Sequence, residues 1–300
     1  MIKNKLYVLL WIGIVALTSC TEDIVMDLPK GEKVPVVEGS LTNEFTRHEV
    51  VLSYSSGLYD KEEREMIEHA EVYVTSDDDT IWYYEQEDRP GHYLTDSVAA
   101  RKNRWYHLEV RVPENTLYSN PLHMYADSKM PNNVSRIDSV LLMPKHDGNN
   151  IPLVNDTIIV NVCPYFQTLS DASIVYQVQI YLNGKLFKNR PAKLMNLFPM
   201  KGYAGYYFNG PEMLENNIEV PVGIMNTAYM DEGDVVKVKL NSITEDYMYF
   251  LMGQKVAIGT NPVMGAYPAM FTNIFSNCNA IGWFKTPSVA VGEGVYHEFR

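Results

Sequence analysis

Short apolar and β-branched runs alternate with polar residues along most of this chain. Such alternation predicts strands, because successive side chains of a strand point to opposite faces of a sheet. The short length of these runs and the turn residues between them are typical of β-sandwich proteins. The runs that we expect as strands cover residues 34–39, 48–53, 70–75, 80–84, 90–94, 105–112, 137–143, 157–162, 174–182, 185–187 and 235–240.

Turn signals and one helical pattern complete this picture. Asn183 and Gly184 lie between two apolar runs, and both tolerate positive φ, so they predict a tight hairpin. Apolar residues recur at helical spacing near 243–257, and Glu245 and Asp246 would occupy the favourable first turn. The sequence therefore predicts one helix close to the C-terminus.

Residues 127–133 have the composition of a turn or linker, and we place a domain boundary there. The expected fold is all-β, with two β-sandwich domains of immunoglobulin or transthyretin-like type. The N-terminal domain is expected over 34–126, and the C-terminal domain over 134–300 with the helix inside it.

The first twenty residues have the layout of a bacterial lipoprotein signal. Two lysines precede an apolar stretch over 6–17, which is shorter than the ~20 residues that a membrane-spanning helix needs. Leu17-Thr18-Ser19-Cys20 resembles a lipobox, so residues 1–19 are expected to be removed, Cys20 acylated, and 20–33 left as a tether. The alternative is an ordinary secretory signal in which a cysteine follows the cleavage site.

Three residues after the lipobox bear on location. Thr21, Glu22 and Asp23 resemble the acidic tag that sends lipoproteins of Bacteroidetes to the outer face of the outer membrane. The alternative is a solvated linker that happens to begin with two acids. We expect a lipid-anchored outer-membrane protein that faces the cell exterior.

Charge and composition exclude some partners. Loss of the signal removes two lysines and no acids, which takes the formal charge from −12 to −14. This charge disfavours nucleic acid, and no lysine- or arginine-rich run creates a local exception. A hydrophobic fraction of 46% is normal for packed globular cores, so the mature chain is not a disordered tether.

Two cysteines remain in the mature chain, Cys163 and Cys278. An oxidising exterior would permit a disulfide between them, and two buried thiols are the alternative.

A search for catalytic chemistry finds none of the common motifs. The chain has no His-Glu-x-x-His, no Gly-x-Ser-x-Gly, no phosphate-binding glycine loop and no Cys-x-x-Cys pair. The 7 histidines have no spacing that suits metal ligation on a helix. We therefore expect a protein that is not an enzyme and that carries no metal and no cofactor.

Aromatic residues are the remaining candidates for ligand contact. The 21 tyrosines and 4 tryptophans offer flat, amphipathic surfaces that can stack on sugar rings or anchor peptides. In the first cluster, Trp82 and Tyr84 would share one face of a strand, and packing inside a sandwich is the alternative to ligand contact. The second cluster, with Tyr203, Tyr206 and Tyr207, has glycines around it and indicates an exposed loop.

The order of several short motifs resembles one known family. The lipobox and acids are followed by Val36-Val37-Glu38-Gly39, and the far end carries Ile243 to Gln254, Asn273-Ile274 and Ile281 to Phe284. This arrangement is similar to the Bacteroidetes lipoproteins catalogued as domain of unknown function 4249. The family has no established activity. Its members look like partners of TonB-dependent outer-membrane transporters, which implies ligand capture or handling at the cell surface.

The leading hypothesis is therefore an accessory lipoprotein without catalytic activity that captures a peptide or glycan for a TonB-dependent transporter. The second is a structural or adhesive surface lipoprotein without a small ligand. The third is a hydrolase with an unrecognised site. A concave aromatic pocket would favour the first hypothesis over the second, and paired carboxylates in a cleft would favour the third.

Overall fold

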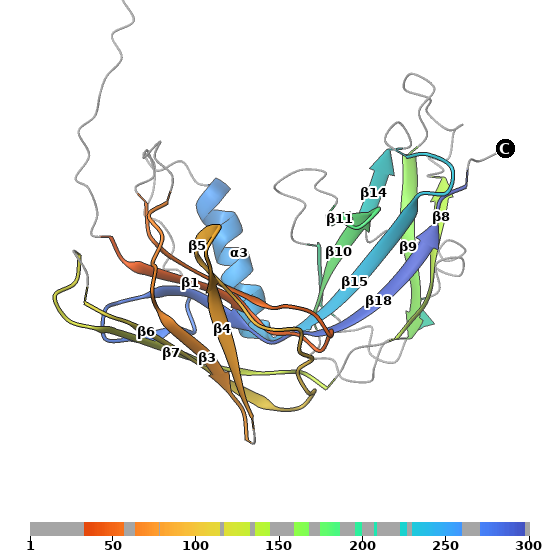
Figure 1. Ribbon diagram of the computed structural model, residues 1–300. Helices are drawn as coiled ribbons and strands as arrows, with labels where there is room; N and C mark the ends of the chain where they lie inside the picture. Colours follow the sequence, from red (N-terminus) through yellow and green to blue (C-terminus); the bar gives the residue numbers. More distant parts are fainter. Residues whose placement is uncertain are drawn as a thin grey trace, which may run out of the picture. The chain divides into compact units, whose positions relative to one another are not determined.

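A computed structural model shows a predominantly β protein with one helix in its described part (Figure 1). The strands and the helix predicted from the sequence pattern are thereby confirmed at this coarse level. No helix within the described ranges is long and apolar enough to cross a membrane. The structure describes residues 33–56, 64–77, 79–114, 117–132, 136–144, 159–167, 175–186, 196–199, 207–208, 223–226, 230–259 and 271–297.

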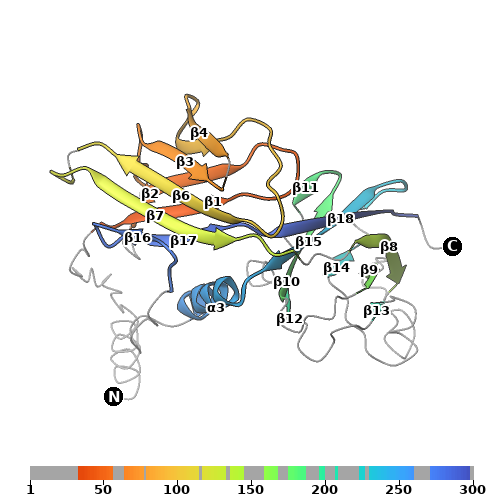
Figure 2. The same cartoon turned by 90° about the horizontal axis from the view of Figure 1, so that it is seen from below.

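The largest sheet has nine strands in the order β16-β7-β6-β3-β4-β5-β2-β1-β17 (Figures 1 and 2). All of its neighbours pair antiparallel except β1 and β17, which run parallel. Its strands are β1 (Pro35–Ser40), β2 (Glu49–Tyr54), β3 (Glu71–Thr75), β4 (Thr80–Gln86), β5 (Arg89–Leu94), β6 (Trp105–Val112), β7 (Leu122–Lys129), β16 (Phe275–Ser276) and β17 (Ile281–Lys285).

One face of this sheet forms the first hydrophobic core. In β6, Tyr106, Leu108 and Val110 are buried while the residues between them are at least partly exposed, as the alternating sequence predicts. Leu52 of β2 and Phe284 of β17 join the same cluster with no exposed surface. The alternation thus separates a packed face from a solvent-facing face.

Two smaller sheets enclose the second core. In the five-stranded sheet, four strands run in the order β11-β10-β15-β18, and β12 also pairs with β10. In the four-stranded sheet, three strands run in the order β13-β9-β14, and β8 also pairs with β9. Side chains from both sheets make up one cluster, for example Val162 and Phe166 with Val178 and Val238. The strands are β8 (Ile137–Pro144), β9 (Ile159–Gln167), β10 (Val175–Leu182), β11 (Lys185–Leu186), β12 (Asn196–Pro199), β13 (Tyr207–Phe208), β14 (Gly223–Asn226), β15 (Val235–Ile243) and β18 (Ser288–Val295).

The predicted hairpin at Asn183-Gly184 is confirmed. Both residues have positive φ, 48° and 79°, and the turn joins β10 to the paired β11. The Asn183 side chain also donates to Asp234 at 2.8 Å and accepts from the amide of Val235 at 3.0 Å. The turn is therefore fixed by its backbone geometry and by its contacts with the start of β15.

The chain crosses the expected boundary at 127–133. Strand β7 continues to Lys129, so the first residues of the expected linker belong to the nine-stranded sheet. Strands β16 and β17, far along the chain, return to the two edges of that sheet. The polar composition of 127–129 predicts a linker, but these residues pair with β6. The end of β7 is therefore decided by pairing between strands, which leaves no local signal in the sequence.

The helix α3 (Glu245–Gly259) lies close to the predicted bounds, and its prediction is confirmed. Thr244 caps it, because its hydroxyl accepts from the amide of Tyr247 at 3.3 Å. Tyr247 and Phe250 pack on Trp283 of β17, with ring centroids 5.6 Å and 5.1 Å away. This third cluster fixes the helix beside the edge of the nine-stranded sheet (Figure 2).

Candidate ligand-binding groove

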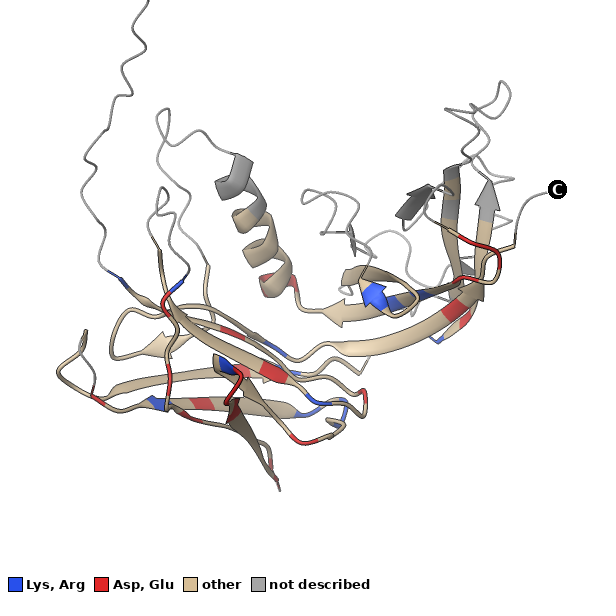
Figure 3. Ribbon diagram, turned by 45° about the horizontal axis from the view of Figure 1, so that its top comes forward, with Lys and Arg blue, Asp and Glu red and all other residues tan. Residues whose placement is uncertain are grey.

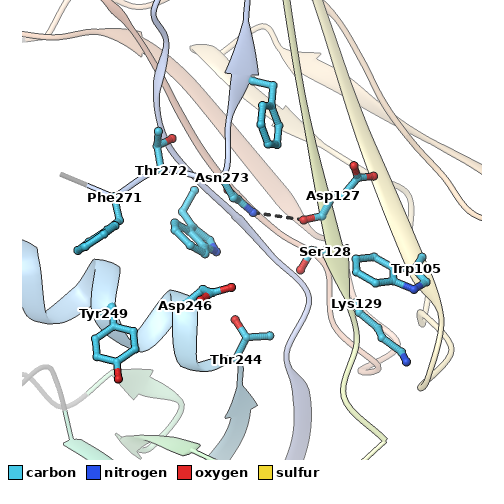
Figure 4. Close-up of a pocket in the computed structure, with 12 residues that line it drawn as sticks. Trp105, Asp127, Ser128, Lys129, Thr244, Asp246, Tyr249, Phe271, Thr272 and Asn273 are labelled. Carbon is cyan, nitrogen blue, oxygen red and sulfur yellow. Dashed lines mark hydrogen bonds between the residues drawn. The ribbon is translucent and has the colours of Figure 1, made fainter. Parts of the chain in front are cut away.

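A groove of about 390 Å³ lies between α3, the ends of β6 and β7, and the segment that leads into β16 (Figure 4). Five of its lining residues are aromatic, and the rest are polar or charged. It is lined by Trp105, Asp127, Ser128, Lys129, Thr244, Asp246, Tyr249, Phe271, Thr272, Asn273, Phe275 and Trp283.

The aromatic lining comes from positions that the packing leaves on the outside. Trp105 is the first residue of β6 and is 58% exposed, because it falls on the outward half of the alternation. Tyr249 of α3 is 51% exposed, since the helix buries Tyr247 and Phe250 against Trp283 instead. Exposed rings that gather in one concave site, and do not lie scattered over the surface, indicate a binding site.

The wall around Asn273 is held by hydrogen bonds between side chains and the backbone. The Asn273 amide donates to the carbonyl of Phe284 at 2.7 Å, and its oxygen accepts from the Phe284 amide at 2.9 Å. The same side chain contacts the carbonyl of Asp127 at 3.5 Å, as Figure 4 shows. The hydroxyl of Thr272 donates to the carbonyl of Gly282 at 2.9 Å. The segment that carries Phe271 and Phe275 is therefore fixed on β17 and β7, and the groove is preformed.

The charges of the groove favour a neutral or cationic ligand. The charged lining residues are two acids, Asp127 and Asp246, and one base, Lys129. Asp246 lies in the first turn of α3, where the helix dipole favours a negative charge, and Figure 3 shows acidic colour there. A polyanion would meet like charge on both sides of the groove.

Asp127 also belongs to a cluster of ionisable groups on β6 and β7. His107 contacts Asp127 through Nδ1 at 2.8 Å and Glu109 through Nε2 at 3.1 Å, so both ring nitrogens face carboxylates. His123 binds the other oxygen of Glu109 at 2.5 Å. Partial burial alone would lower the pKa of His107, but the hydrogen bonds with Asp127 and Glu109 raise it above its ordinary value.

The pKa of Glu109 moves in the opposite direction. Its partial burial would raise the pKa, but hydrogen bonds from His123 and His107 hold it below the ordinary value. These hydrogen bonds therefore favour the charged form of Glu109 and the charged form of His107.

The aromatic residues predicted on 80–84 lie outside the groove. Trp82 and Tyr84 of β4 are 43% and 55% exposed, while Tyr83 between them is buried in the first core. The predicted sharing of one face by Trp82 and Tyr84 is thus observed, and that face points to solvent. Trp82 packs against Tyr73 of β3, with ring centroids 4.9 Å apart.

The second predicted cluster is mostly beyond what the structure describes. Tyr203 and Tyr206 lie outside the described residues, and Tyr207 is described only through its backbone, which pairs with Gln167 in β9. Cys20, Thr21, Glu22 and Asp23 also lie outside the described residues. The roles given to these residues stay predictions.

Cys163 and Cys278 lie in different parts of the fold, and no disulfide joins them in this structure. Cys163 lies in β9 opposite Leu141, whereas Cys278 follows β16 and packs against the first core. Burial raises the pKa of Cys278, which disfavours a reactive thiolate.

The groove residues were not among the aromatic residues predicted from the sequence. The predicted aromatic residues cluster along the chain, whereas the groove is lined by single rings from separate segments. The outward position of Trp105 in an alternating strand was visible, but its proximity to Tyr249 depends on the return of β17 to the first sheet. Within the described ranges, no group of His, Cys, Asp and Glu residues has the arrangement of a metal site.

Fold and groove together define a predominantly β protein with an open, aromatic-lined surface site. The chain belongs to the family described as domain of unknown function DUF4249, whose model matches residues 21–291. That description names no catalytic activity. The family predicted from the order of the sequence motifs is therefore confirmed.

The other comparisons add little. No curated protein matches the chain. One solved structure, described under "Structural insight into host cell surface retention of a 1.5-MDa bacterial ice-binding adhesin", aligns with a TM-score of 0.20 and 11% identity. The alignment covers 89% of this chain and 65% of that chain, just under two thirds of its length. A score this low carries no argument about fold or function.

Proposed function

We propose that this protein is an outer-membrane lipoprotein that captures a peptide or glycan in the aromatic groove and delivers it to a TonB-dependent transporter. The observation that carries the proposal is the groove of about 390 Å³, with exposed rings on a preformed wall. A structural or adhesive protein without a small ligand has no need of such a concave site.

The chemistry of the groove suits reversible capture. Exposed Trp and Tyr rings bury large apolar area when a ligand covers them, and their polar edges remain hydrated. Aromatic anchors of this kind are the residues whose truncation costs most at binding surfaces. Trp105 and Tyr249 are 58% and 51% exposed, so both have much surface left to bury.

The groove carries two carboxylates, and their environment supports binding without catalysis. Hydrolysis of a glycosidic bond requires one protonated carboxyl as the general acid. Asp127 instead is 54% exposed and its carboxylate accepts a hydrogen bond from His107 at 2.8 Å, so it lacks the apolar pocket that surrounds a general acid. We therefore propose a protein that is not an enzyme.

Location and partner belong to the same proposal. The lipobox ending at Cys20 and the acids Glu22 and Asp23 support acylation and surface exposure. The transporter partner is inferred from the family resemblance of the sequence. We also propose that the two separate hydrophobic clusters correspond to two β-sandwich-like modules.

Capture from native outer membranes tests the partner. The affinity-tagged wild-type protein should carry a TonB-dependent transporter and a peptide or glycan, both identified by mass spectrometry. The Tyr249→Ala variant should retain the transporter and lose the ligand, while Phe45→Ala, a change at a ring 78% exposed and outside the groove, should retain both. Recovery of neither transporter nor ligand with the wild type would contradict the proposal.

Acylation is tested separately. Metabolic labelling with a fatty-acid probe should mark the wild-type protein and leave Cys20→Ala unmarked, and the variant should leave the membrane fraction. An unmarked wild type, or an unchanged fractionation of Cys20→Ala, would remove the membrane anchor from the account.

A further inference from the structure

The outward face of the nine-stranded sheet carries a row of residues that runs across five strands. The register places each member directly opposite the next: Trp82 with Tyr73, Tyr73 with Glu109, Glu109 with Tyr125, and Tyr125 with Phe275. The row thus follows the strand order β4-β3-β6-β7-β16. Adjacent strands lie about 4.8 Å apart, so its two ends are about 19 Å from each other.

Both ends of the row are ring platforms. Trp82 is 43% exposed and contacts Tyr73, and Phe275 is 56% exposed and stacks on Tyr125 with centroids 5.3 Å apart. Each exposed ring therefore packs against a tyrosine of the neighbouring strand that is itself only partly exposed. Supported rings lose little conformational entropy when a ligand covers them.

The centre of the row is polar. Glu109 lies there, with His107 and Asp127 on one side and Arg111 and His123 on the other. Arg111 also lies over the ring of Tyr73, 5.6 Å from its centroid. The side chains of Arg111 and His123 are 56% and 47% exposed, although Arg111 also contacts Glu71 and His123 also contacts Glu109.

A row with aromatic rings at both ends and polar side chains at its centre disfavours three kinds of ligand. A wholly apolar partner would take the exposed side chains of Arg111 and Asp127 out of water without offering them hydrogen bonds. A peptide strand needs unpaired backbone groups at a sheet edge, whereas the row lies on a face whose backbone groups are paired across the ladder. A polyanion would meet the carboxylates of Glu71, Glu109 and Asp127. The basic side chains beside them, Arg111, His107 and His123, already contact these carboxylates.

A neutral glycan meets each requirement. Its sugar rings have apolar C–H faces that lie flat on aromatic rings, and its hydroxyls can donate to Asp127, which is 54% exposed, and accept from Arg111. Its chain can extend over the distance between the two platforms.

The row also meets the groove. Phe275, at one end of the row, is a lining residue of the groove, and so is Asp127 beside the polar centre. A chain that lies on the row can therefore continue into the groove without leaving the protein surface.

Resting on the proposed ligand capture, we propose that the captured ligand is a neutral glycan and that the row from Trp82 to Phe275 binds its chain outside the groove. The groove would hold one part of the glycan, and the row would extend the binding site across the sheet.

Native gel electrophoresis with embedded ligands tests this proposal. The gels contain α-glucan, β-glucan, mannan, xylan or galactan as neutral probes, heparin as the anionic probe, and casein peptides as the peptide probe. The wild type should be retarded by at least one neutral polysaccharide and not by heparin. Trp82→Ala should weaken that retardation by about 10-fold in apparent affinity, the scale of a lost aromatic anchor.

Matched variants separate the row from folding and from the groove. Trp82→Phe keeps a ring and should retain most of the affinity, whereas Phe45→Ala should equal the wild type. Tyr249→Ala changes the groove alone. Circular dichroism and thermal unfolding of each variant check that its fold is intact.

The outcomes distinguish the two proposals. Weakening by both Trp82→Ala and Tyr249→Ala supports both. Weakening by Tyr249→Ala alone, or retention by casein peptides and by no polysaccharide, overturns the glycan row and leaves capture in the groove standing. Absence of retention on every probe, together with no ligand recovered from outer membranes, overturns both.

Discussion

The two faces of the nine-stranded sheet are formed by the same strands, but one face packs in the core and the other contacts solvent. The inner face carries Leu108 and Phe284, which are almost completely buried, whereas the outer face carries Glu109 and Phe275 in contact with solvent. Leu108 and Glu109 are neighbours in β6, so a single step along the chain separates core from surface. Stability and the proposed binding surface can therefore be changed independently.

The largest effect is expected where β17 pairs with β1 at the edge of the sheet. Gly282 has a φ of 117°, and a Cβ added there would overlap the backbone carbonyl of Val37. Gly282→Ala should lower the free energy of unfolding by more than about 4 kcal/mol, because neither backbone can move without breaking the pairing. Gly184→Ala is the matched control, since its φ is 79° but no atom lies within 4 Å of the added Cβ.

Urea unfolding of both variants measures this difference. Gly184→Ala should cost only about 1 kcal/mol, from its backbone conformation alone. Equal losses in the two variants would show that contact with Val37 does not limit the position of β17.

Two phenylalanines compare the faces directly. Phe284→Ala removes a side chain with no exposed surface and should cost about 3–5 kcal/mol, while Phe275→Ala, at a ring 56% exposed, should cost less than about 1 kcal/mol. The same urea titration measures both. A loss at Phe275 as large as that at Phe284 would mean that the outer row is part of a core.

Two tyrosines give a smaller contrast. The hydroxyl of buried Tyr93 accepts from the amide of Ala70 at 3.0 Å and donates to the carbonyl of Ile67 at 2.9 Å. Tyr93→Phe leaves both backbone groups without this partner and should cost about 1–3 kcal/mol. Tyr84→Phe, on the exposed side of β4, should unfold like the wild type. Thermal unfolding of the pair is the measurement, and identical midpoints would contradict a structural role for the Tyr93 hydroxyl.

The smallest effect is the pH dependence of the outer cluster. The raised pKa of His107 contributes stability that is present below its ordinary 6.5 and is lost as pH rises through the folded value. The lowered pKa of Glu109 contributes stability that is present above its ordinary 4.5 and is lost as pH falls through the folded value. Both contributions are complete between these two pH values.

Glu109→Gln should therefore lose most stability, relative to the wild type, between pH 4.5 and 6.5. The loss should be below about 1 kcal/mol because the partners of Glu109 are partly exposed, and it should shrink at pH 8 and in high salt. Urea titrations of both proteins across this pH range measure it. A difference that grows towards pH 8 would contradict the assigned charges.

Much of the fold was predictable because it depends on local alternation. The inward residues of β6, the Asn183-Gly184 turn and the helix with acids in its first turn all have signals within a few residues. The end of β7 and the return of β16 and β17 have no local signal, because they depend on pairing between distant segments.

The same limit applies to the candidate site. The exposure of Trp82 and the burial of Tyr83 follow from alternation within one strand. The groove brings Trp105 to Tyr249 and Phe271, residues from three separate segments, and their proximity depends on where α3 and β17 dock. Aromatic clusters read along the chain could not reveal a site assembled in this way.

The most direct test of ligand capture is equilibrium binding of the probe that the wild type retains, by titration calorimetry, to the groove variants Trp105→Ala and Tyr249→Ala. The account predicts a loss of about 10-fold or more in affinity for each groove variant and unchanged affinity for Phe45→Ala. Wild-type affinity in both groove variants would show that the groove does not hold the ligand and would contradict the central claim.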